Sequence, residues 1–371
     1  MMTNQKPLIL HISKHFLPVY GGLERIIEGT IFYTRSDFDS ISMCYNDDLN
    51  GLQNKLLPFE DVNSISVHRI KCIKIGWLHF GFFKPSLILK ADIIHVHNCD
   101  LLLDIIILFK FLTGFKAKII ASSHGLIFHH NQFKSLKVLY LRLSFFVKNK
   151  FTDKIIANGL NDYKFLIEVL KSKKTVLIEN PVSMKYHKIN SERSGIISVN
   201  RLQNSKNIER NIQICEQLIL LGFNEPIRFI VSGKDGEIKK LMEKQSVRNP
   251  RFQFIANCSE QEKWNLFSES RYFIHSAEYE GFGISVLESL LSGCLTFVTD
   301  QVAGNFRHHQ FTNLFSFSLT DSNETIGRRI LAEVYFSTPV ISEETKNNFD
   351  WNHQGQKFSE IYKQVLSDNE H

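Results

Sequence analysis

The stretch YFIHSAEYEGFGISVLE, residues 272–288, joins an apolar run of strand length, a glycine loop and the start of an apolar helix. Two glycines open the helix, so the backbone amides near Gly283 to Ser285 lack helical partners and can hold an anion. Glu280 lies on the loop and Glu288 about one turn into the helix, and a carboxylate can accept both hydrogen bonds of a diol. For Glu288 the alternative is a surface ion pair at i,i+4 spacing, but positions 284 and 292 carry no Lys or Arg.

The same alternation of short apolar runs with helical patterns extends along the whole chain. Runs that are apolar on both faces and alternate with helices are typical of parallel sheets covered on both sides. The series restarts after a polar stretch that opens with Asn180-Pro181, which we interpret as a hinge between two α/β domains. We expect the ligand in a cleft between the two domains, at the carboxyl ends of the strands. The expected strands are 8–12, 93–96, 118–121, 154–157 and 175–178, then 196–199, 227–231, 252–255, 272–275 and 295–298.

Three further strand-end loops carry residues suited to a charged ligand. Gly21 and Gly22 precede a helical run, where they let amides approach a phosphate, although a plain turn explains them equally well. His124 ends the third expected strand and can donate a hydrogen bond or carry a proton; a purely structural histidine is the alternative. Arg201 and Lys206 follow the first strand of the second domain, where two cations suit a diphosphate or are simply solvated.

Together these loops resemble the retaining glycosyltransferases of family 4, which have the GT-B fold of two Rossmann-like domains. Glu280 and Glu288, with seven residues between them, resemble the E-x7-E motif of that family. The chain departs from the family at Asn207, where Gly is usual, after Gly293, where a Pro is missing, and at 302–307, where one Gly replaces two. The other matching segments are Gly21-Gly22-Leu23-Glu24, Ser123-His124-Gly125, Asn180-Pro181-Val182, Arg201-Leu202 to Lys206, Gly233-Lys234-Asp235-Gly236, Glu280-Gly281-Phe282-Gly283 and Phe349-Asp350-Trp351.

The resemblance implies a fold and a reaction. Residues 1–185 would form an acceptor-binding Rossmann-like domain, residues 186–348 a nucleotide-sugar-binding one, and residues 349–371 a helix that packs back on the first. The reaction would move a sugar from a UDP- or GDP-linked donor, with retention, to a hydroxyl of a glycan or lipid-linked acceptor. Such a transferase would act in bacterial surface polysaccharide or lipopolysaccharide synthesis.

The resemblance also implies residue roles. Glu280 and His124 would be the catalytic residues, with Glu280 on the hydroxyls of the donor sugar and His124 on the donor sugar or the acceptor side. Glu288 would hold the ribose hydroxyls. The leaving diphosphate gains negative charge, which cations and helix amides can stabilise. The donor-binding set is therefore Gly21, Gly22, Arg201, Lys206, Gly281, Phe282, Gly283, Ile284 and Glu288.

We expect no metal and no other cofactor. Asp47-Asp48 lie in a polar stretch that makes an unconvincing cation site. His95 and His97 share one face of a strand, which permits chelation, but no third ligand has matching spacing. We therefore favour packing or polar contacts for the two histidines.

Two other functions remain open from the sequence. The same fold could serve a sugar-nucleotide epimerase or hydrolase, against which the spacing of Glu280 and Glu288 argues. It could also serve a non-catalytic partner subunit of a transferase. That alternative predicts missing cations or carboxylates, whereas Arg201, Lys206 and both glutamates are present.

The positive charge of this 371-residue chain is concentrated in one block. The net charge is +6, yet residues 110–174 alone carry 13 basic and 3 acidic side chains. Within that block, residues 133–151 interleave apolar and cationic side chains, which suits an anionic membrane surface or an ordinary solvated helix face. Nucleic acid is disfavoured because the aromatic residues are not spaced as stacking platforms.

Composition and cysteine usage indicate the class and compartment. Hydrophobic residues make up 43% and charged residues 22%, which excludes disordered and fibrous proteins. The six cysteines include no C-x-x-C pair, and no secretory signal or membrane span is visible. We expect a cytoplasmic protein, either soluble or peripheral on the inner face of the membrane.

Overall fold

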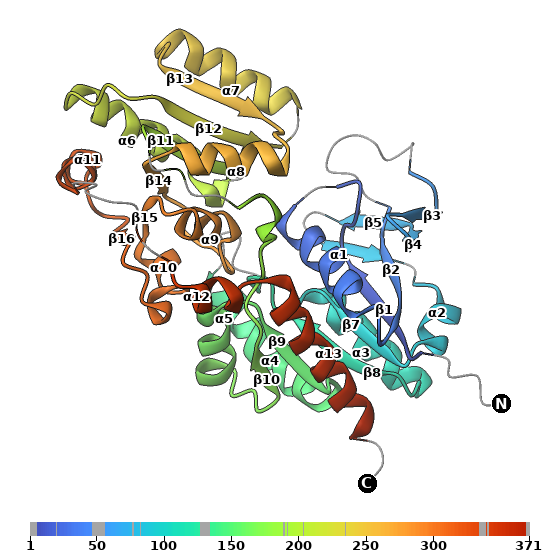
Figure 1. The fold of residues 1–371 in the computed structure, drawn as a ribbon. Helices are drawn as coiled ribbons and strands as arrows, with labels where there is room; N and C mark the ends of the chain where they lie inside the picture. Colours follow the sequence, from blue (N-terminus) through green and yellow to red (C-terminus); the bar gives the residue numbers. More distant parts are fainter. Residues whose placement is uncertain are drawn as a thin grey trace. The chain divides into compact units, whose positions relative to one another are not determined.

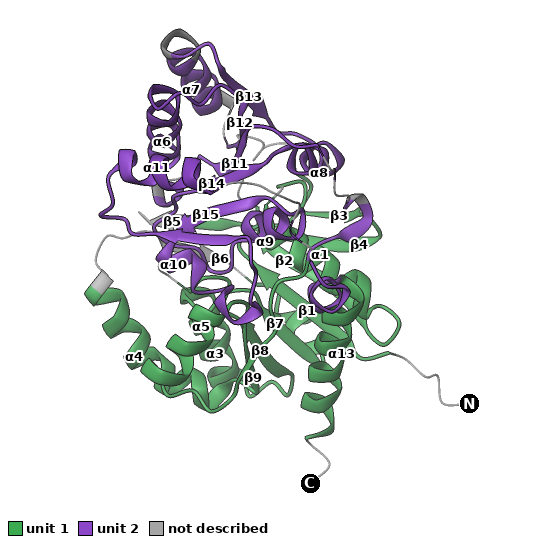
Figure 2. Ribbon diagram, turned by 60° about the vertical axis from the view of Figure 1, so that its left-hand side comes forward, with its two compact units in different colours: residues 1–181, 351–371 green, residues 182–350 purple. Residues whose placement is uncertain are grey.

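The chain folds into two compact units, Met1–Pro181 with Trp351–His371 and Val182–Asp350 (Figure 2). The divisions follow Pro181 and Asp350, whereas we predicted them after residues 185 and 348. The backbone N–H of Val182 donates to the Phe349 carbonyl (3.0 Å), and the fully buried Phe349 ties both crossing segments to unit 2. The computed structural model describes residues 6–19, 21–46, 56–75, 78–81, 83–126, 134–187, 190, 192–202, 204–233, 235–333, 339 and 341–368.

Unit 1 is built on a sheet with strand order β10-β9-β8-β7-β1-β2-β4-β3 (Figure 1). Its neighbouring strands are parallel except for β3 with β4, and the separate β5–β6 ribbon is antiparallel too. The predicted parallel sheet is thus present, with antiparallel pairs added at its β3 edge and in the ribbon. Asn63 and Ser64 have φ of 52° and 64°, and such a two-residue turn joins antiparallel neighbours. The strands are β1 Leu8–Ser13, β2 Asp39–Tyr45, β3 Phe59–Val62, β4 Ile65–Ile70, β5 Cys72–Ile75, β6 Leu78–Gly81, β7 Ile93–Val96, β8 Lys118–Ser122, β9 Lys154–Ala157 and β10 Thr175–Leu177.

Helices cover both faces of the unit 1 sheet. Ile94 and Ile119 pack in the cluster that includes α3 and α4, whereas Ile93 and Ile120 pack in the cluster that includes α13. Side chains alternate along each strand, so strands with apolar residues at successive positions supply both clusters. Among the described residues, no helix is long and apolar enough to cross a bilayer. The helices are α1 Gly22–Thr34, α2 Pro85–Lys90, α3 Leu101–Thr113, α4 Lys134–Phe151, α5 Leu160–Lys164 with the π-helical Phe165–Val169, and α13 Trp351–Ser367.

The last helix, α13, belongs to unit 1 although it follows unit 2 in the chain. The Trp351 ring stacks on Tyr33 of α1, with ring centroids 5.4 Å apart. Further along, Asp37 accepts hydrogen bonds from Ser359 (2.6 Å) and Lys363 (2.8 Å). Gly29 lies against the Trp351 ring, and a Cβ at that position would overlap it. The close contact of α1 with α13 therefore requires a glycine at position 29.

Unit 2 has an all-parallel sheet with order β13-β12-β11-β14-β15-β16. One face packs on α8 and α9, and the other packs on α6, α7 and α11. The strands are β11 Ile196–Arg201, β12 Ile227–Ser232, β13 Phe252–Ala256, β14 Tyr272–His275, β15 Leu295–Thr299 and β16 Leu314–Phe317. The helices are α6 Ile208–Leu220, α7 Asp235–Arg248, α8 Glu260–Glu269, α9 Ile284–Leu291, α10 Asp300–Ala303, α11 Asn323–Ala332 and α12 Glu343–Asn348, with short 3-10 turns Met184–Tyr186, Asn204–Lys206 and Arg307–His309.

Candidate active site

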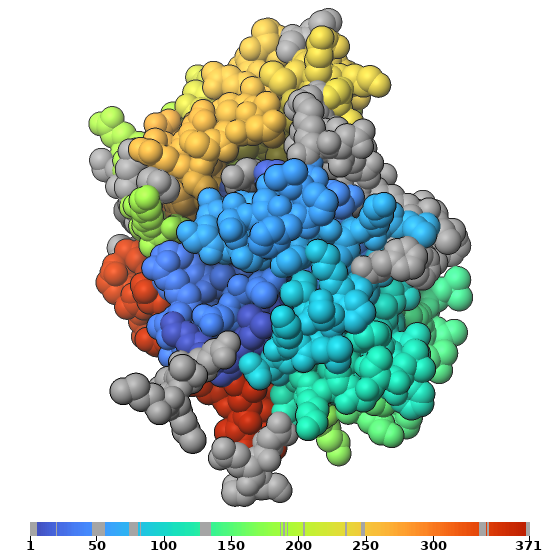
Figure 3. All heavy atoms as spheres, turned by 90° about the vertical axis from the view of Figure 1, so that its right-hand side faces the viewer, coloured from blue at the N-terminus to red at the C-terminus, as the bar shows by residue number. Residues whose placement is uncertain are grey.

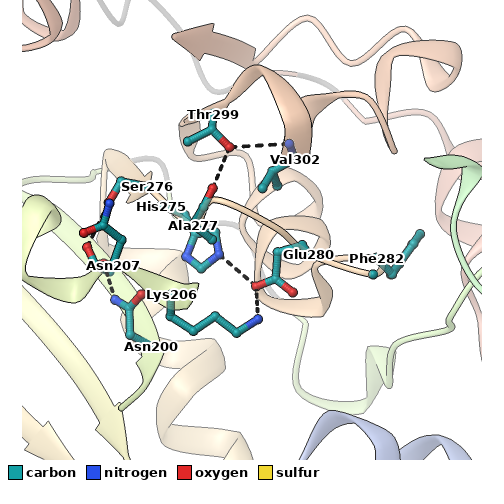
Figure 4. A network of polar contacts seen from close by, with 12 residues as sticks. Asn200, Lys206, Asn207, His275, Ser276, Ala277, Glu280, Phe282, Thr299 and Val302 are labelled. Carbon is teal, nitrogen blue, oxygen red and sulfur yellow. Dashed lines mark hydrogen bonds and ion pairs between the residues drawn. The ribbon is translucent and has the colours of Figure 1, made fainter. Parts of the chain in front are cut away.

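The carboxylate of Glu280 is the centre of the polar cluster in unit 2 (Figure 4). It follows β14 on the loop to α9, and its Oε1 accepts from Lys206 Nζ and pairs with Nε2 of His275 (2.9 Å). Both contacts use Oε1, and among the described residues Oε2 receives no hydrogen bond. The side chains of Lys206 and Glu280 are 15% and 12% exposed. The second carboxylate oxygen thus remains available to a ligand hydroxyl.

Opposing effects set the charge of Glu280. Burial raises the pKa of the carboxyl group, but the positive charge of Lys206 and the hydrogen bond from His275 outweigh burial. The pKa of Glu280 is therefore held well below its usual range, and the group is a carboxylate at neutral pH. A largely buried carboxylate with one engaged oxygen is a strong acceptor for the hydroxyls of a sugar.

The glycine loop that follows Glu280 is held in place by Asn305. The side-chain amide of this fully buried residue donates to the carbonyls of Gly281 (3.3 Å) and Phe282 (3.0 Å). Gly283 then caps α9 with φ of 98°, a left-handed conformation that favours glycine. Val286 and Leu287 are the first residues of α9 whose amides donate back, both to the Gly283 carbonyl at 3.0 Å, so the amides of Ile284 and Ser285 precede the helical hydrogen bonds.

A second polar network joins the ends of β11 and β14 to α6. The side-chain amide of Asn211 donates to Ser198 Oγ (3.0 Å), and its oxygen accepts from the backbone N–H of Ser276 (2.9 Å). Asn200 Nδ2 also donates to Ser198 Oγ, at 2.7 Å. These buried contacts hold the β14 end, from which the Glu280 loop departs. Arg201 lies half-buried at the end of β11, on the connection that leads to Lys206.

Asparagine at position 207, where the resembled family usually has glycine, is explained by its backbone conformation. Asn207 precedes α6 with φ of 50°, which is the left-handed region. Glycine enters that region without steric cost, and asparagine enters it more readily than other side chains. Its carbonyl also accepts from Ser276 Oγ (3.0 Å). Asn207 therefore supports the turn that a glycine would otherwise form.

Glu288 is buried in α9 and paired with a lysine from another helix. Lys263 of α8 lies 2.5 Å from Glu288 and 2.9 Å from Glu260. The sequence test at positions 284 and 292 missed this partner, because Lys263 comes from a separate element. Glu288 is thus not a surface ion-pair residue: it is 3% exposed.

In unit 1, the Gly21–Gly22 loop and His124 follow β1 and β8, whose ends lie on one edge of the sheet. Gly21 is the N-cap of α1. His124 has φ of 41°, and its backbone N–H donates to Asn158 (3.2 Å). Asp162 accepts from the neighbours of His124, namely Ser123 Oγ (2.5 Å) and Gly125 N–H (2.8 Å). These bonds fix the His124 loop in a conformation that is uncommon for a side-chain-bearing residue.

Behind His124 lie three fully buried histidines, His11, His95 and His97. One ring nitrogen from each lies within 4.8 Å of the others, a spacing that a metal site would need. The third ligand that the sequence search lacked is His11, which comes from a different strand. However, His95 already uses Nδ1 with Tyr362 (2.7 Å) and Nε2 with Ser122 (2.8 Å). The cluster therefore fits polar contacts better than metal binding.

The acidic and cationic candidates are evident in the sequence, but the residues that support them are not. His275, Lys263 and Asn305 contact Glu280, Glu288 and the glycine loop, respectively. Only His275 carried a sequence signal, because it ends the expected strand before the Glu280 loop. Tyr20, Asp47-Asp48, Phe133 and Lys234 lie outside the described residues.

Residues 180–309 match the family model of glycosyl transferases group 1. Among curated proteins, the chain is similar to two GDP-mannose:cellobiosyl-diphosphopolyprenol alpha-mannosyltransferases. The one from Komagataeibacter xylinus is 21% identical over 391 residues, which cover 96% of this chain and 93% of that protein. The one from Xanthomonas oryzae pv. oryzae (strain PXO99A) is 20% identical over 302 residues, covering 79% and 78%.

A solved structure with the same fold is Anabaena Alr3699/HepE in complex with UDP and glucose. It superposes with a TM-score of 0.71 at 17% identity and covers 96% of this chain and 99% of that chain. A glycosyltransferase from Rickettsia africae ESF-5 gives a TM-score of 0.65 at 21% identity, over 98% and 99% of the two chains. These likenesses confirm the GT-B fold that the sequence resemblance implied.

Proposed function

We propose that this chain, whose residues 180–309 match the group 1 glycosyl transferase model, moves a sugar, with retention, from a nucleotide diphosphate sugar to a hydroxyl of a lipid-linked glycan. The observation that carries the proposal is the ionised Glu280, held between Lys206 and His275 with one oxygen open. Its loop leads directly into the amide end of α9. One short segment thus offers acceptors for sugar hydroxyls and donors for a phosphate.

Each candidate residue has a role in this proposal. Glu280 binds the hydroxyls of the transferred sugar, and Glu288 shares its charge between Lys263 and the ribose hydroxyls. Arg201 and Lys206 hold the diphosphate together with the amides of the glycine loops. His124 contacts the transferred sugar or the acceptor hydroxyl.

Catalysis in this proposal comes from positioning and electrostatics. The leaving diphosphate gains charge as the glycosidic bond breaks, and fixed cations and amides stabilise that charge. We propose that no metal is needed for this step. Transfer should therefore persist in EDTA at the rate measured with Mg²⁺, and a large loss that Mg²⁺ restores would contradict a metal-free mechanism.

The two matched relatives are named for transfer from GDP-mannose to a cellobiosyl-diphosphopolyprenol, and the Anabaena structure holds UDP and glucose. We infer that this chain takes a UDP- or GDP-linked hexose and a polyprenyl-diphosphate-linked glycan, as in surface polysaccharide synthesis. The test offers purified enzyme a panel of both donor types with such an acceptor. Labelled sugar should appear in the lipid fraction, and the anomeric configuration of the product should match that of the donor.

The site is tested by comparing two carboxylates on the same loop. Glu280→Gln should lower transfer about 10²–10³-fold, because it removes the charge that binds the sugar. Glu278→Gln, two residues away, is the matched control and should transfer at the wild-type rate. Full turnover by Glu280→Gln, with product formed at the normal rate, would overturn the proposed site.

We also propose that unit 1 binds an anionic membrane surface through α4, as the interleaved sequence of 133–151 suggests. The outward side of α4 is largely apolar, unlike an ordinary solvated helix face. It adjoins α3 (Figures 2 and 3), where the rings of Phe111 and Phe151 lie 6.3 Å apart. The exposed apolar side chains on the two helices are Leu108, Phe111, Leu112, Leu136, Leu139, Leu143, Phe146 and Val147.

The charges on α4 are divided between its two sides. Lys148 is fully buried and pairs with Asp104 of α3 (3.0 Å), which ties the helices together. Arg142 and Lys150 are exposed beside the apolar side chains. Exposed cations beside an exposed apolar surface are the combination that binds anionic lipid. The acceptor's polyprenyl chain would lie in the same membrane.

Vesicle co-sedimentation tests this surface. The wild-type protein should bind vesicles that contain anionic lipid more than zwitterionic ones, and Leu143→Ser with Phe146→Ser should reduce binding. Leu220→Ser, which changes an equally exposed leucine in unit 2, is the control and should bind as wild type does. Equal binding of wild type to both vesicle types would exclude the proposed surface.

A further inference from the structure

His124 is the end of a chain of hydrogen-bonded imidazole rings. His11 Nδ1 lies 3.0 Å from His97 Nε2, and His97 Nδ1 lies 3.2 Å from His124 Nε2. The rings of His11 and His97 are stacked with centroids 5.3 Å apart, and those of His97 and His124 with centroids 5.5 Å apart. His97 therefore contacts one histidine through each of its nitrogens.

The two inner rings are neutral. Burial lowers the pKa of His11 to about 3, and burial together with the neighbouring histidines lowers the pKa of His97 well below its usual value. A neutral imidazole has one N–H donor and one bare acceptor nitrogen. His97 must therefore donate to one neighbour and accept from the other, so the chain of bonds has a direction.

The buried end of the chain decides that direction. His11 Nε2 is buried and, within the described residues, has no hydrogen-bond partner. A buried N–H without an acceptor is a rare and costly arrangement, so the His11 proton belongs on Nδ1, which faces His97. His97 Nε2 then accepts, and its proton lies on Nδ1. His97 consequently donates to Nε2 of His124.

We propose that His97 is a positioning residue that sets the tautomer of His124, with the bare Nε2 facing inward and the proton on Nδ1. The proposal rests on the function proposed above, in which His124 contacts the sugar or the acceptor. With Nε2 occupied by His97, His124 meets a substrate hydroxyl as a neutral N–H donor. The hydrogen bonds that the backbone N–H groups of His124 and Gly125 donate to Asn158 and Asp162 hold the loop, and His97 holds the ring.

A pair of substitutions at one position separates this role from simple packing. His97→Asn keeps an amide N–H near the Nδ1 position, whereas His97→Leu removes the donor and keeps an apolar side chain of similar size. We expect His97→Leu to lower kcat at least about tenfold, with affinity for free UDP or GDP unchanged, and His97→Asn to recover most of the rate. Equal kcat for the two variants would overturn the proposal.

His95→Leu is the matched control, because His95 is also fully buried on β7 but bonds Tyr362 and Ser122 instead of His124. It should lower thermal stability and leave kcat unchanged. If His95→Leu lowers kcat as much as His97→Leu, the loss reflects packing of the strand, and the proposed role of His97 fails.

The tautomer itself is measured without substrate. In protein labelled with ¹⁵N-histidine, the His124 signals, identified by their loss in His124→Gln, should show a protonated Nδ1 and a bare Nε2. In His97→Leu this preference should disappear. A protonated Nε2 in the wild type would refute the inference even if sugar transfer is demonstrated. Failure of every donor to react would instead refute the proposed function and leave the tautomer result standing.

Discussion

The ion pair between Lys206 and Glu280 offers the sharpest quantitative test of the unit 2 site. Replacing Lys206 with methionine leaves the largely buried Glu280 carboxylate with His275 as its one remaining partner among the described residues. Breaking a fully buried pair destabilises a protein by about 3–5 kcal/mol. This pair keeps some solvent contact and His275 remains, so we expect Lys206→Met to lower the free energy of unfolding by about 2–3 kcal/mol.

The pairwise contribution follows from a double-mutant cycle. Lys206→Met, Glu280→Gln and the double variant are unfolded in denaturant at pH 7 without ligand, alongside the wild type. Because the two side chains are in direct contact, we expect a coupling free energy of about 1–3 kcal/mol. If the two single effects add to within about 0.5 kcal/mol, the charges do not interact in the folded protein and the site description is wrong.

The contribution of Glu280 to the free energy of unfolding should also depend on pH. Glu280 has a lowered pKa when folded, so its stabilisation is fully present above its unfolded pKa of 4.5. That stabilisation is lost as the pH falls from the unfolded-state pKa through the lower pKa that Glu280 has in the folded protein. The stability difference between wild type and Glu280→Gln should therefore shrink on acidification below about pH 4.5. A constant difference down to pH 3 would contradict the lowered pKa.

Two further predictions concern backbone positions. Gly29→Ala should destabilise unit 1 by about 1–3 kcal/mol, because the added Cβ overlaps the Trp351 ring. Gly236→Ala is the control: its Cβ would enter open space on α7, so the change should be neutral or stabilising. Equal thermal midpoints for the two variants would show that α13 does not pack closely on α1. Asn207→Ala should lower the free energy of unfolding by about 1 kcal/mol, because alanine is strained in the left-handed backbone conformation at this position, whereas Asn207→Gly should not lower it. Equal unfolding midpoints for the two variants would show that the left-handed conformation imposes no cost on alanine.

Most of the strands were predictable because they are short runs in which apolar residues occupy successive positions. The ten expected runs correspond to β1, β7 to β15, with ends that differ by a residue or two. The missed strands have other patterns. β2, Asp39–Tyr45, begins with polar residues, and β3, Phe59–Val62, lies at a sheet edge with exposed positions. Edge strands bury less apolar surface, so their sequences carry a weaker signal.

The candidate site was predictable where its functional residues lie close together in one segment of the sequence. Glu280, the glycines and Glu288 occupy a single loop and helix, so their spacing alone indicated hydroxyl and anion binding. Their partners come from other elements: His275 precedes Glu280 closely, but Lys206 and Lys263 are brought in by the fold. Sequence distance carries no information on such contacts. For the same reason, His11 was not recognised as the neighbour of His97.

The sequence by itself determined the two α/β halves, the reaction class and the residues that carry charge to the strand ends. It could do so because apolar periodicity and loop motifs are local properties of the chain. Only the tertiary structure decided which oxygen of Glu280 is engaged and that Glu288 is buried against Lys263. It also decided that α4 turns Lys148 inward and three of its leucines, Leu136, Leu139 and Leu143, outward. Those features depend on which elements pack against one another, since burial and pairing are set by neighbours that are distant in sequence.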